Sequence, residues 1–451
     1  MRSIALSIGA AAMLSGCATP APYAPSATPM ALPPTFLTEF RPEAGTADVW
    51  WRGFGDPRLD ALVERALEQN LTVAAARSRL EAARAAVLAE RSDRGPSLDL
   101  DAGIDLLGGT AEDARLGAAA GAGVLFDPDI SGRLSQEIEA AAARARANEY
   151  LVADARRLVA AAVAQQYIEL RRSEARLGLL EESTELQQQT LRIVELRYEA
   201  GLSANLDVRR AAADLAQTEA QRGVLLLQRA QAARALSVLL GEVPQPLPER
   251  PDAPAIPNFV AGPPTGIPAD LLRRRPDLLV AEADLAEAAA LVGAEQADLL
   301  PALALTGRID IGDGLASGLF GDLFGTIGAI LDVPLFDGGR RRAEIAAARA
   351  EADARFTDYR QTLLDALREV ENALVGIDSY TSRSTSLRDA IEQSETAFTQ
   401  SNALYREGLT SLFDVLDAQR QLINSRQSLI DSEAEIAFAI IDLYSATGAP
   451  P

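Results

Sequence analysis

The chain has 451 residues with a formal net charge of −21, and its composition is 48% hydrophobic, 24% charged and 5% aromatic. It contains no His, one Cys, and only Arg among its 43 basic residues, which excludes imidazole acid–base chemistry, Cys/His zinc sites, internal disulfides and lysine Schiff bases. The strong negative charge argues against a nucleic-acid partner. Abundant Ala and Leu favour long helices.

The N-terminus has the pattern of a lipoprotein signal peptide over residues 1–16. Arg2 precedes the apolar run IALSIGAAAML, which is too short to span a bilayer. Leu14-Ser15-Gly16-Cys17 then resembles a lipobox, so Cys17 is predicted to carry a covalent lipid and to begin the mature chain. An ordinary secretory signal with an incidental Cys is the alternative. Residues 17–55 form a Pro-rich, lipid-anchored segment.

A first repeat is predicted over residues 56–240. Asp56-Pro57 opens a helix that continues to about Asp93. Strands follow at about 97–107 and 116–126, where apolar residues alternate with Asp or Gly. The remaining predicted elements are a long helix over 132–199, a break at Gly201, a helix over 205–240, and a Pro-rich connector over 241–268.

The same pattern returns over residues 269–447. A helix from Asp270 to Leu300 is followed by strands at about 302–311 and 324–336, a long helix over 338–406 and a helix over 410–446. A shift of 207 residues superposes Tyr198 on Tyr405, Gly201 on Gly408 and Asp207 on Asp414. The chain is therefore predicted to be a tandem internal duplication.

Four strands per chain are too few to close a membrane barrel. An open sheet edge in lipid would leave backbone groups without partners, so membrane strands require several copies of the chain. Three copies give twelve strands and an aqueous lumen, whereas two give eight strands with a filled interior. The alternative is a pair of edge hairpins in a soluble α/β protein. The long helices are predicted to pack as antiparallel coiled-coil pairs.

Several motifs resemble one known family. They are Trp50-Trp51-Arg52-x-Phe54-x-Asp56-Pro57-x-Leu59, Leu272-Arg273-Arg274-Arg275-Pro276-Asp277, Phe336-Asp337-Gly338-Gly339-Arg340, and the run from Tyr405 to Arg420. Together they resemble the TolC-like outer-membrane channels, and the lipobox points to the NodT-like lipoprotein branch, the outer-membrane factors of RND-type efflux systems. The resemblance covers nearly the whole mature chain.

The resemblance implies a mainly α fold with membrane β: a homotrimer with a twelve-stranded outer-membrane β-barrel, continued by a long periplasmic α-helical barrel. The implied function is the exit duct of a tripartite efflux pump, a passive conduit for small molecules rather than an enzyme. Its partners would be a periplasmic adaptor, an inner-membrane RND-type pump and outer-membrane lipid. Alternatives are a type I protein-secretion duct and, from another class, a lipid-anchored periplasmic adaptor, which would use a single hairpin. The cargo is not encoded in any motif.

The functional residues implied by the resemblance lie at the periplasmic ends of the coiled coils. The implied gate residues are Asp414, Asp417 and Tyr405, with Asp207 at the corresponding place in the first repeat. The implied adaptor-contacting tips are Gly201, Leu202 and Ser203, and Gly408, Leu409, Thr410 and Ser411. No catalytic residue, metal ligand or cofactor other than the Cys17 lipid is expected.

Two of these residues have a second interpretation from local structure. Ser411-x-x-Asp414 has the spacing of a helix capping box, and capping and gating are compatible roles for Asp414. Gly201 and Gly408 suit left-handed turn positions. The first repeat has Arg210 where the second has Asp417, so the two tips are not equivalent.

Overall fold

The computed structural model describes residues 23, 47–109, 112–245, 255–259, 273–311 and 323–448. The predicted signal peptide, Cys17, most of the 17–55 segment and much of the 241–268 connector lie outside these residues. The chain divides into two compact units. Unit 1 comprises Met1–Met30, Arg77–Tyr150 and Leu279–Thr362; unit 2 comprises Ala31–Ala76, Leu151–Leu278 and Leu363–Pro451. Each unit draws on both repeats, so the sequence repeats and the compact units are different divisions of the chain.

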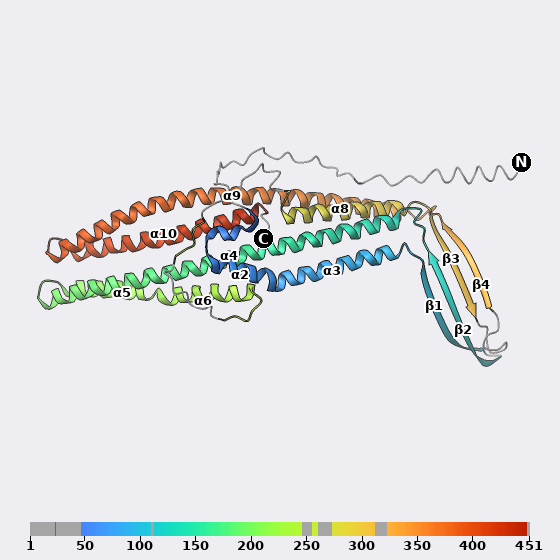
Figure 1. The fold of residues 1–451 in the computed structure, drawn as a ribbon, viewed down its shortest axis with the longest axis horizontal. Coiled ribbons are helices and arrows are strands. Elements are labelled where there is room, and N and C mark those ends of the chain that lie inside the picture. The colour runs from blue at the N-terminus through green and yellow to red at the C-terminus, as the bar shows by residue number, and fades with distance from the viewer. Residues whose placement is uncertain are drawn as a thin grey trace. The chain divides into compact units, whose positions relative to one another are not determined.

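The described elements follow the predicted order of helix, strand, strand, long helix and helix, twice over (Figure 1). The elements of the N-terminal half are η1 (Ala47–Phe54), α2 (Pro57–Gln69), α3 (Leu71–Ser92), β1 (Ser97–Gly109), β2 (Glu112–Phe126), α4 (Arg133–Glu199), α5 (Asn205–Glu219) and α6 (Arg222–Leu239). Those of the C-terminal half are α8 (Pro276–Ala297), β3 (Ala302–Ile311), β4 (Leu323–Asp332), α9 (Arg340–Arg406) and α10 (Leu412–Ala446). The helices α4 and α9 have 67 residues each, as expected for duplicated elements.

In unit 1 the described strands form one antiparallel sheet in the order β1-β2-β3-β4, so β1 and β4 are its edges. Alternate residues of a strand point to opposite faces, and apolar residues gather on one face. Across that face Leu98 pairs with Val124, and Leu100 with Ala122. Leu98 and Leu100 are 72% and 82% exposed, and Ile327 of β4, on the same face, is 97% exposed. Within the described residues of one chain, the sheet therefore leaves an apolar face uncovered.

The opposite face of the sheet carries an ion-pair network. Arg308 on β3 donates to Asp310 at 2.6 Å and to Asp101 on β1 at 2.9 Å. Its guanidinium must cross β2 to reach β1, and it does so over Gly121, where an added Cβ would lie 2.6 Å from Arg308 Nη2. The glycines that alternate along β2 thus leave room for a charged side chain from the next strand.

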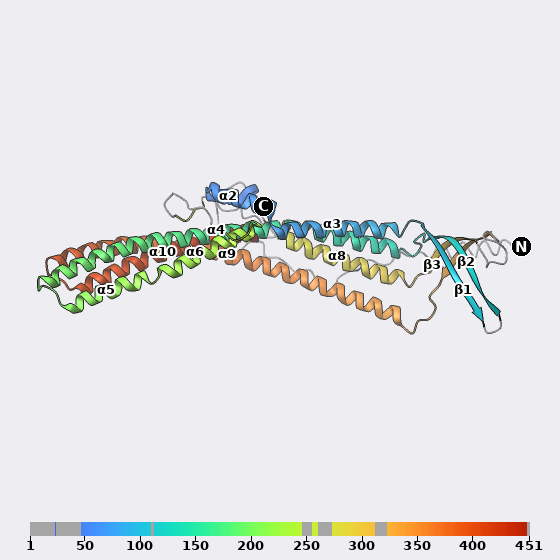
Figure 2. The ribbon, with the colours of Figure 1, turned by 90° about the horizontal axis from the view of Figure 1, so that it is seen from below.

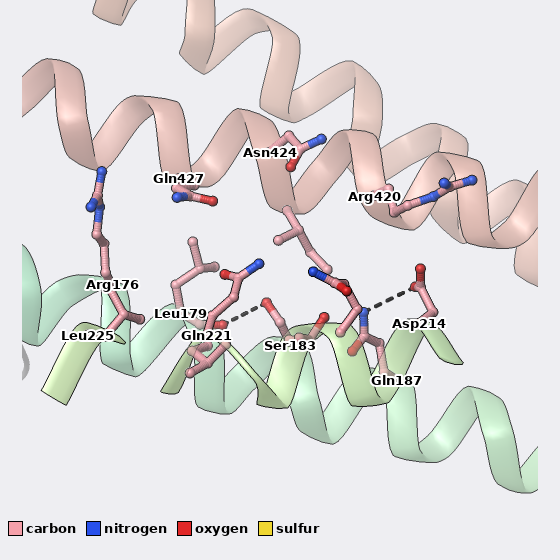
Figure 3. A pocket seen from close by; sticks show the side chains of 14 residues that line it. Arg176, Leu179, Ser183, Gln187, Asp214, Gln221, Leu225, Arg420, Asn424 and Gln427 are labelled. Atoms are coloured by element: carbon pink, nitrogen blue, oxygen red, sulfur yellow. Dashed lines mark hydrogen bonds between the residues drawn. The ribbon is translucent and has the colours of Figure 1, made fainter. Parts of the chain in front are cut away.

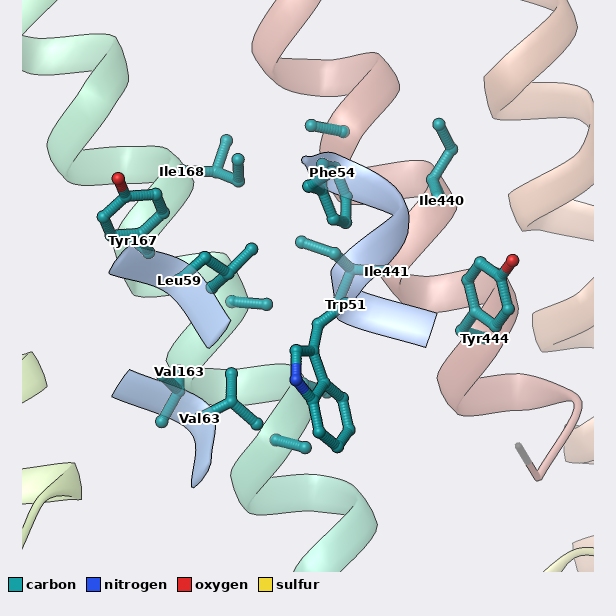
Figure 4. Close-up of a cluster of buried hydrophobic side chains, with 14 of the residues drawn as sticks. Trp51, Phe54, Leu59, Val63, Val163, Tyr167, Ile168, Ile440, Ile441 and Tyr444 are labelled. Atoms are coloured by element: carbon teal, nitrogen blue, oxygen red, sulfur yellow. The ribbon is translucent and has the colours of Figure 1, made fainter. Parts of the chain in front are cut away.

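The core of unit 2 includes the two tryptophans of η1. Figure 4 shows Trp51 in this core, among side chains of α2, α4 and α10. Trp50 stacks on Tyr444 of α10 with 5.4 Å between ring centroids, and Trp51 is 3% exposed. Asp56 caps α2 by accepting from the Arg58 amide at 3.0 Å, and it also accepts from the buried Tyr167 hydroxyl at 2.6 Å. The Trp-Trp motif therefore fixes η1 onto α4 and α10.

A buried arginine precedes α8 in the same unit. Arg275 is 2% exposed, and its guanidinium donates to Asp277 at 2.7 Å, to Glu369 at 2.8 Å and to the carbonyl of Ala446 at 2.8 Å. The pKa of Asp277 is lowered: burial raises it, but the hydrogen bonds and charge of Arg275 outweigh that cost. The helix predicted from Asp270 instead begins at Pro276. Proline suits the first helical position, and it disfavours helical backbone in the residue before it.

Two predicted helices are interrupted. The helix expected from Asp56 to Asp93 divides at Asn70, whose side-chain oxygen accepts from the amides of Thr72 and Val73 and so caps α3. The Asn70 amide nitrogen donates to the carbonyl of Leu239, which fixes the break by a contact distant in sequence. The helix expected over 205–240 divides between α5 and α6 at Ala220 and Gln221.

Two strand predictions also change. The strand expected at about 324–336 ends at Asp332, since Pro334 lacks the amide hydrogen needed for further pairing. The weaker strand expected at about 116–126 is longer, because β2 starts at Glu112. Among the described residues, no helix is both long and apolar enough to span a membrane.

Candidate functional site

Two helical hairpin turns in unit 2 hold the predicted site residues. The first joins α4 to α5, and the second joins α9 to α10 (Figure 2). Gly201 and Gly408 have φ of +74° and +78°, in the left-handed region that glycine adopts without strain. The amide of Leu202 donates to the Arg197 carbonyl at 2.8 Å, and that of Leu409 to the Leu404 carbonyl at 2.9 Å. Both long helices therefore end in the same glycine-dependent motif.

The second turn contains a complete capping box. Asp414 Oδ2 accepts from the Ser411 amide at 3.1 Å, while the Ser411 hydroxyl oxygen accepts from the Asp414 amide. The same carboxylate oxygen accepts from the hydroxyls of Thr410 and Ser411 at 2.6 and 2.7 Å. These hydrogen bonds, that of Thr410 first, lower the pKa of Asp414 below the ordinary aspartate value. The capping interpretation is confirmed, and the carboxylate stays both charged and exposed.

Asp417 lies one turn further along α10 and is also exposed. Its carboxylate is 3.6 Å from Arg420 Nη2, a surface pair that leaves 69% of the Asp417 side chain accessible. Residues three apart on a helix share a face, so Asp414 and Asp417 present two carboxylates on one side of α10. In the first repeat, Asp207 accepts from the Ser203 hydroxyl at 2.9 Å, and Arg210 takes the place of Asp417.

Tyr405 is buried against the second turn, unlike its repeat partner Tyr198. Tyr405 is 6% exposed and packs in an apolar cluster with Val194, Phe398 and Leu412, whereas Tyr198 is 44% exposed. Arg197, near the end of α4, covers the Tyr405 ring with its guanidinium carbon 4.8 Å from the ring centroid. Sequence patterns did not single out Arg197, although its repeat position holds Leu404.

The predicted adaptor-contacting residues lie at the turns themselves. Leu202 and Leu409 are 67% and 73% exposed, so each turn presents a leucine to its surroundings. The neighbouring Ser203, Thr410 and Ser411 turn their hydroxyls to the aspartates of their own turn. Each tip thus combines an exposed leucine with a fixed carboxylate.

A cavity of about 170 Å³ lies between α4, α5, α6 and α10, and both polar and apolar side chains line it (Figure 3). Gln187 is 3% exposed and donates to Asp214 at 3.2 Å, and Arg420 lies across the cavity on α10. Burial raises the pKa of Asp214, against the opposing effects of Arg420 and Gln187. The sequence analysis did not predict this cavity, because the residues that line it lie far apart in the sequence.

A family model described as outer membrane efflux protein matches residues 62–242 and 267–449. The chain belongs to this outer membrane efflux protein family. The two matched segments coincide with the two repeats, as expected if the family itself contains the duplication. The resemblance drawn from the sequence motifs is thereby confirmed.

Curated relatives and a solved structure agree with this assignment. The efflux protein is 30% identical over 453 residues to nodulation protein T of Rhizobium leguminosarum bv. trifolii, covering 97% of this chain and 96% of the relative. It is 30% identical over 438 residues to outer membrane protein OprJ of Pseudomonas aeruginosa, covering 90% and 91%. The structure of the outer-membrane channel OprN superposes with a TM-score of 0.84 at 30% identity, covering 96% of this chain and 99% of that one.

These comparisons establish the architecture and the role of the efflux protein. It has the TolC-like fold of outer-membrane channels, with a four-stranded sheet per chain and a large periplasmic helical part. It is the outer-membrane exit duct of an efflux system. Among the described residues, no group of three or more His, Cys, Asp or Glu side chains is placed to hold a metal ion.

Proposed function

We propose that three copies of the chain assemble into a channel that carries small molecules passively out of the periplasm. The observation that carries this proposal is the sheet, whose two edge strands and apolar face have no cover within the described part of one chain. Joining edge β4 of one copy to edge β1 of the next removes both open edges. Three sheets supply twelve strands, enough for an aqueous lumen.

The polar face of the sheet suits the interior of such a barrel. The charged face carries Arg308, Asp101 and Asp310, and the opposite face carries Leu98 and Leu100. In a closed barrel, the charged face would line the aqueous lumen and the apolar face would contact lipid. The partners we propose are a periplasmic adaptor, which contacts the exposed tips at Leu202 and Leu409, and an inner-membrane RND-type pump. The duct itself needs neither catalysis nor a cofactor.

We further propose that the second turn forms the periplasmic gate. In a trimer, Asp414 and Asp417 become two stacked rings of three carboxylates each. Such rings raise the local cation concentration and offer oxygen ligands to multivalent ions. Asp207 contributes to the gate from the neighbouring first turn. Tyr405 contributes from the buried side of the α9–α10 hairpin.

Assembly and conduction can be tested on the detergent-extracted protein. Light scattering and cross-linking should show a heat-sensitive trimer, and planar bilayers should show a small, cation-selective conductance blocked by di- or trivalent cations from the periplasmic side. A stable monomer would refute the closed barrel, and an absence of conductance from intact trimers would refute the duct.

The lipid anchor is tested separately because Cys17 lies outside the described residues. Mass spectrometry of the mature N-terminus should find a diacylglyceryl-modified Cys17. Cys17→Ser should abolish that modification and leave the channel properties of purified trimers unchanged. A mature chain that begins elsewhere without lipid would contradict the proposal.

A further inference from the structure

One residue of the predicted lipid-anchored segment, Tyr23, contacts the helices α8 and α9 within unit 1. Its hydroxyl donates to Asp353 Oδ1 on α9 at 2.5 Å. Its ring packs against small apolar residues of both helices. These residues form the α8–α9 seam: Ala288, Val292, Ala348 and Ala352. The N-terminal segment is therefore held at Tyr23 by a contact between residues 330 apart in sequence.

The α8–α9 seam suits an aromatic side chain with a polar end. Alanine side chains are small and leave room for a ring, and Val292 and Ala352 are fully buried beneath it. A buried tyrosine needs a partner for its hydroxyl, and Asp353 supplies a carboxylate oxygen for a charge-assisted hydrogen bond. Burial of the ring, and then the hydrogen bond to Asp353, raise the pKa of Tyr23 to about 12, so the hydroxyl remains a donor.

The internal duplication provides an equivalent seam that has no acceptor for the hydroxyl. In the first repeat, Ala83 and Val87 of α3 stand at the positions of the two α8 seam residues, and both are buried. Arg146 of α4 stands at the position of Asp353. An arginine cannot accept a hydrogen bond, and Arg146 pairs with Glu139 at 3.0 Å. The apolar floor is therefore common to both repeats, whereas the acceptor belongs to the second repeat.

The chain between Tyr23 and the predicted lipid is short. Six residues lead from Tyr23 back to Cys17, and they span at most about 20 Å. Asp353 lies 13 residues after Arg340, the first residue of α9, which corresponds to about 20 Å of helix. The strand β4 precedes this end of α9. A lipid on Cys17 can therefore just reach the level at which the sheet begins.

We infer that Tyr23 docks the lipid-anchored segment on the α8–α9 seam and so confines the Cys17 lipid to the membrane beside β3 and β4 of the same chain. This inference rests on the proposed lipid anchor, because Cys17 must carry a lipid for its position to matter. Tyr23 is thus a positioning residue for the lipid. In the proposed trimer, each chain carries its lipid beside the second repeat and none beside the first, although both repeats present similar helices and strands.

Chymotrypsin digestion of purified trimers measures the docking, because the protease cleaves after an accessible tyrosine. Cleavage after Tyr23 releases a peptide from Cys17 to Tyr23, whose mass reports the lipid and whose rate of release reports the docking. In Asp353→Ala the release should be about tenfold faster or more, because the charge-assisted hydrogen bond is lost. Asp358→Ala is the matched control: it removes the same charge from a 69% exposed position of α9 and should be cleaved like the parent.

Three further variants separate docking from a general role of Asp353. Asp353→Asn keeps an acceptor oxygen without the charge, so its rate should lie between those of the parent and Asp353→Ala. Ala348→Leu keeps Asp353 but enlarges a side chain of the seam against which the ring packs, so it should also accelerate release. Tyr23→Phe remains a chymotrypsin site and loses only the hydroxyl. Combining it with Asp353→Ala should give no further acceleration, because both changes remove the same hydrogen bond.

The place of the lipid is tested with a photoreactive fatty acid incorporated into the lipid of Cys17. After irradiation of the trimers, mass spectrometry should find more cross-linked acyl chain on peptides of β3 and β4 than on peptides of β2. Asp353→Ala should reduce this excess, because the segment is then free to leave the seam.

The outcomes separate the docking from the anchor on which it rests. If the released peptide carries no lipid, the proposed anchor is wrong and the inference is wrong with it. If the peptide is lipidated but leaves the parent, Asp353→Ala and Tyr23→Phe equally fast, the docking is wrong and the anchor stands. An even distribution of cross-links in the parent would refute the confinement of the lipid. Loss of trimers in Asp353→Ala, Ala348→Leu and Tyr23→Phe alike would assign the contact to assembly and would also overturn the inference.

Discussion

The two hairpin turns of this efflux protein share one backbone and one hydroxyl-to-aspartate hydrogen bond, but they differ in their helix caps and in the burial of their tyrosines. Gly201 and Gly408 have φ values within a few degrees of each other, and equivalent amides close both long helices. In the second turn, Ser411 and Asp414 cap the next helix, whereas Ala204 occupies the cap of the first without a side-chain hydrogen bond. The duplication thus preserved the turn geometry while the chemistry displayed on it changed.

This difference is the reason for placing the proposed gate chiefly at the second turn, with Asp207 of the first turn contributing to it. The capping box holds Asp414 on the exposed face of α10 that also carries Asp417, and Arg197 lies over the ring of the buried Tyr405. The first turn has an exposed tyrosine and an arginine at the place of Asp417. Equivalent substitutions in the two turns therefore separate effects of the shared backbone conformation from effects of the side-chain contacts that differ.

The largest expected effect comes from removing the carboxylates of the second turn. Asp414→Ala/Asp417→Ala should weaken block by divalent and trivalent cations, raising the blocking concentration by about tenfold or more, because the rings concentrate cations at the constriction. The measurement is single-channel conductance in planar bilayers, together with trimer yield. Asp207→Ala, the equivalent change in the first turn, should have a much smaller effect.

Asp417→Ala alone sharpens this test, because Asp417 does not cap α10 while Asp414 does. It should reduce block without altering the helix start. If neither the double variant nor Asp417→Ala changes cation block, the gate assignment is wrong and capping is the whole role of Asp414. A double variant that fails to form trimers would leave the single variant to decide.

A second pair of substitutions should affect both turns equally. Gly201→Ala and Gly408→Ala each place a Cβ on a left-handed residue, at a cost of about 1 kcal/mol. Steric space does not limit either substitution. Among the described residues beyond the chain neighbours, no atom lies within 4 Å of a Cβ added at Gly201, and the nearest atom to one added at Gly408 is Arg197 Nη2, 3.8 Å away. Amide hydrogen exchange at the two turns should accelerate to a similar extent. Clearly unequal changes would show that side-chain contacts, rather than φ, set the cost.

Elements that depend on local patterns could be predicted from the sequence. The alternation of Leu98 and Leu100 with aspartates predicted a strand, and the strand predicted at 302–311 corresponds to β3. Gly201 and Gly408 marked the ends of α4 and α9, and Ser411-x-x-Asp414 predicted the capping box. In each case the residues that determine the structure are neighbours in sequence.

Features that depend on distant contacts could not be predicted in the same way. Asn70 interrupts a helix because its amide also reaches the Leu239 carbonyl, and Arg275 is buried because Glu369 and Ala446 surround it. The contact between Arg197 and Tyr405 joins residues 208 apart. In the sequence, the only indication of this contact is a difference between the repeats: the first repeat has Arg197 where the second has Leu404.

A third comparison exchanges the helix caps of the two turns. Ser411→Ala should destabilise the start of α10 by about 1 kcal/mol, the usual cost of losing a serine cap. Ala204→Ser should stabilise the start of α5 by up to a similar amount, because Ala204 has the extended backbone of a cap and lacks only the hydroxyl. Exchange rates of the first amides of α5 and α10 measure both effects. If the amide protection is unchanged in both variants, the helix caps do not account for the difference between the two turns.

The smallest expected effect is a pH dependence confined to the second turn. The pKa of Asp414 is lowered because its ionised carboxylate accepts hydrogen bonds from Thr410 and Ser411. Its contribution to the folded turn is therefore fully present above the ordinary aspartate pKa of about 3.9 and is lost as pH falls through the lower folded-state value. Protection of the first α10 amides should persist down to that ordinary value and decline below it. Asp414→Asn cannot titrate, so it should remove this decline while its side-chain oxygen still accepts from Ser411. A decline centred above the ordinary value would show that the capping box does not stabilise the charged form.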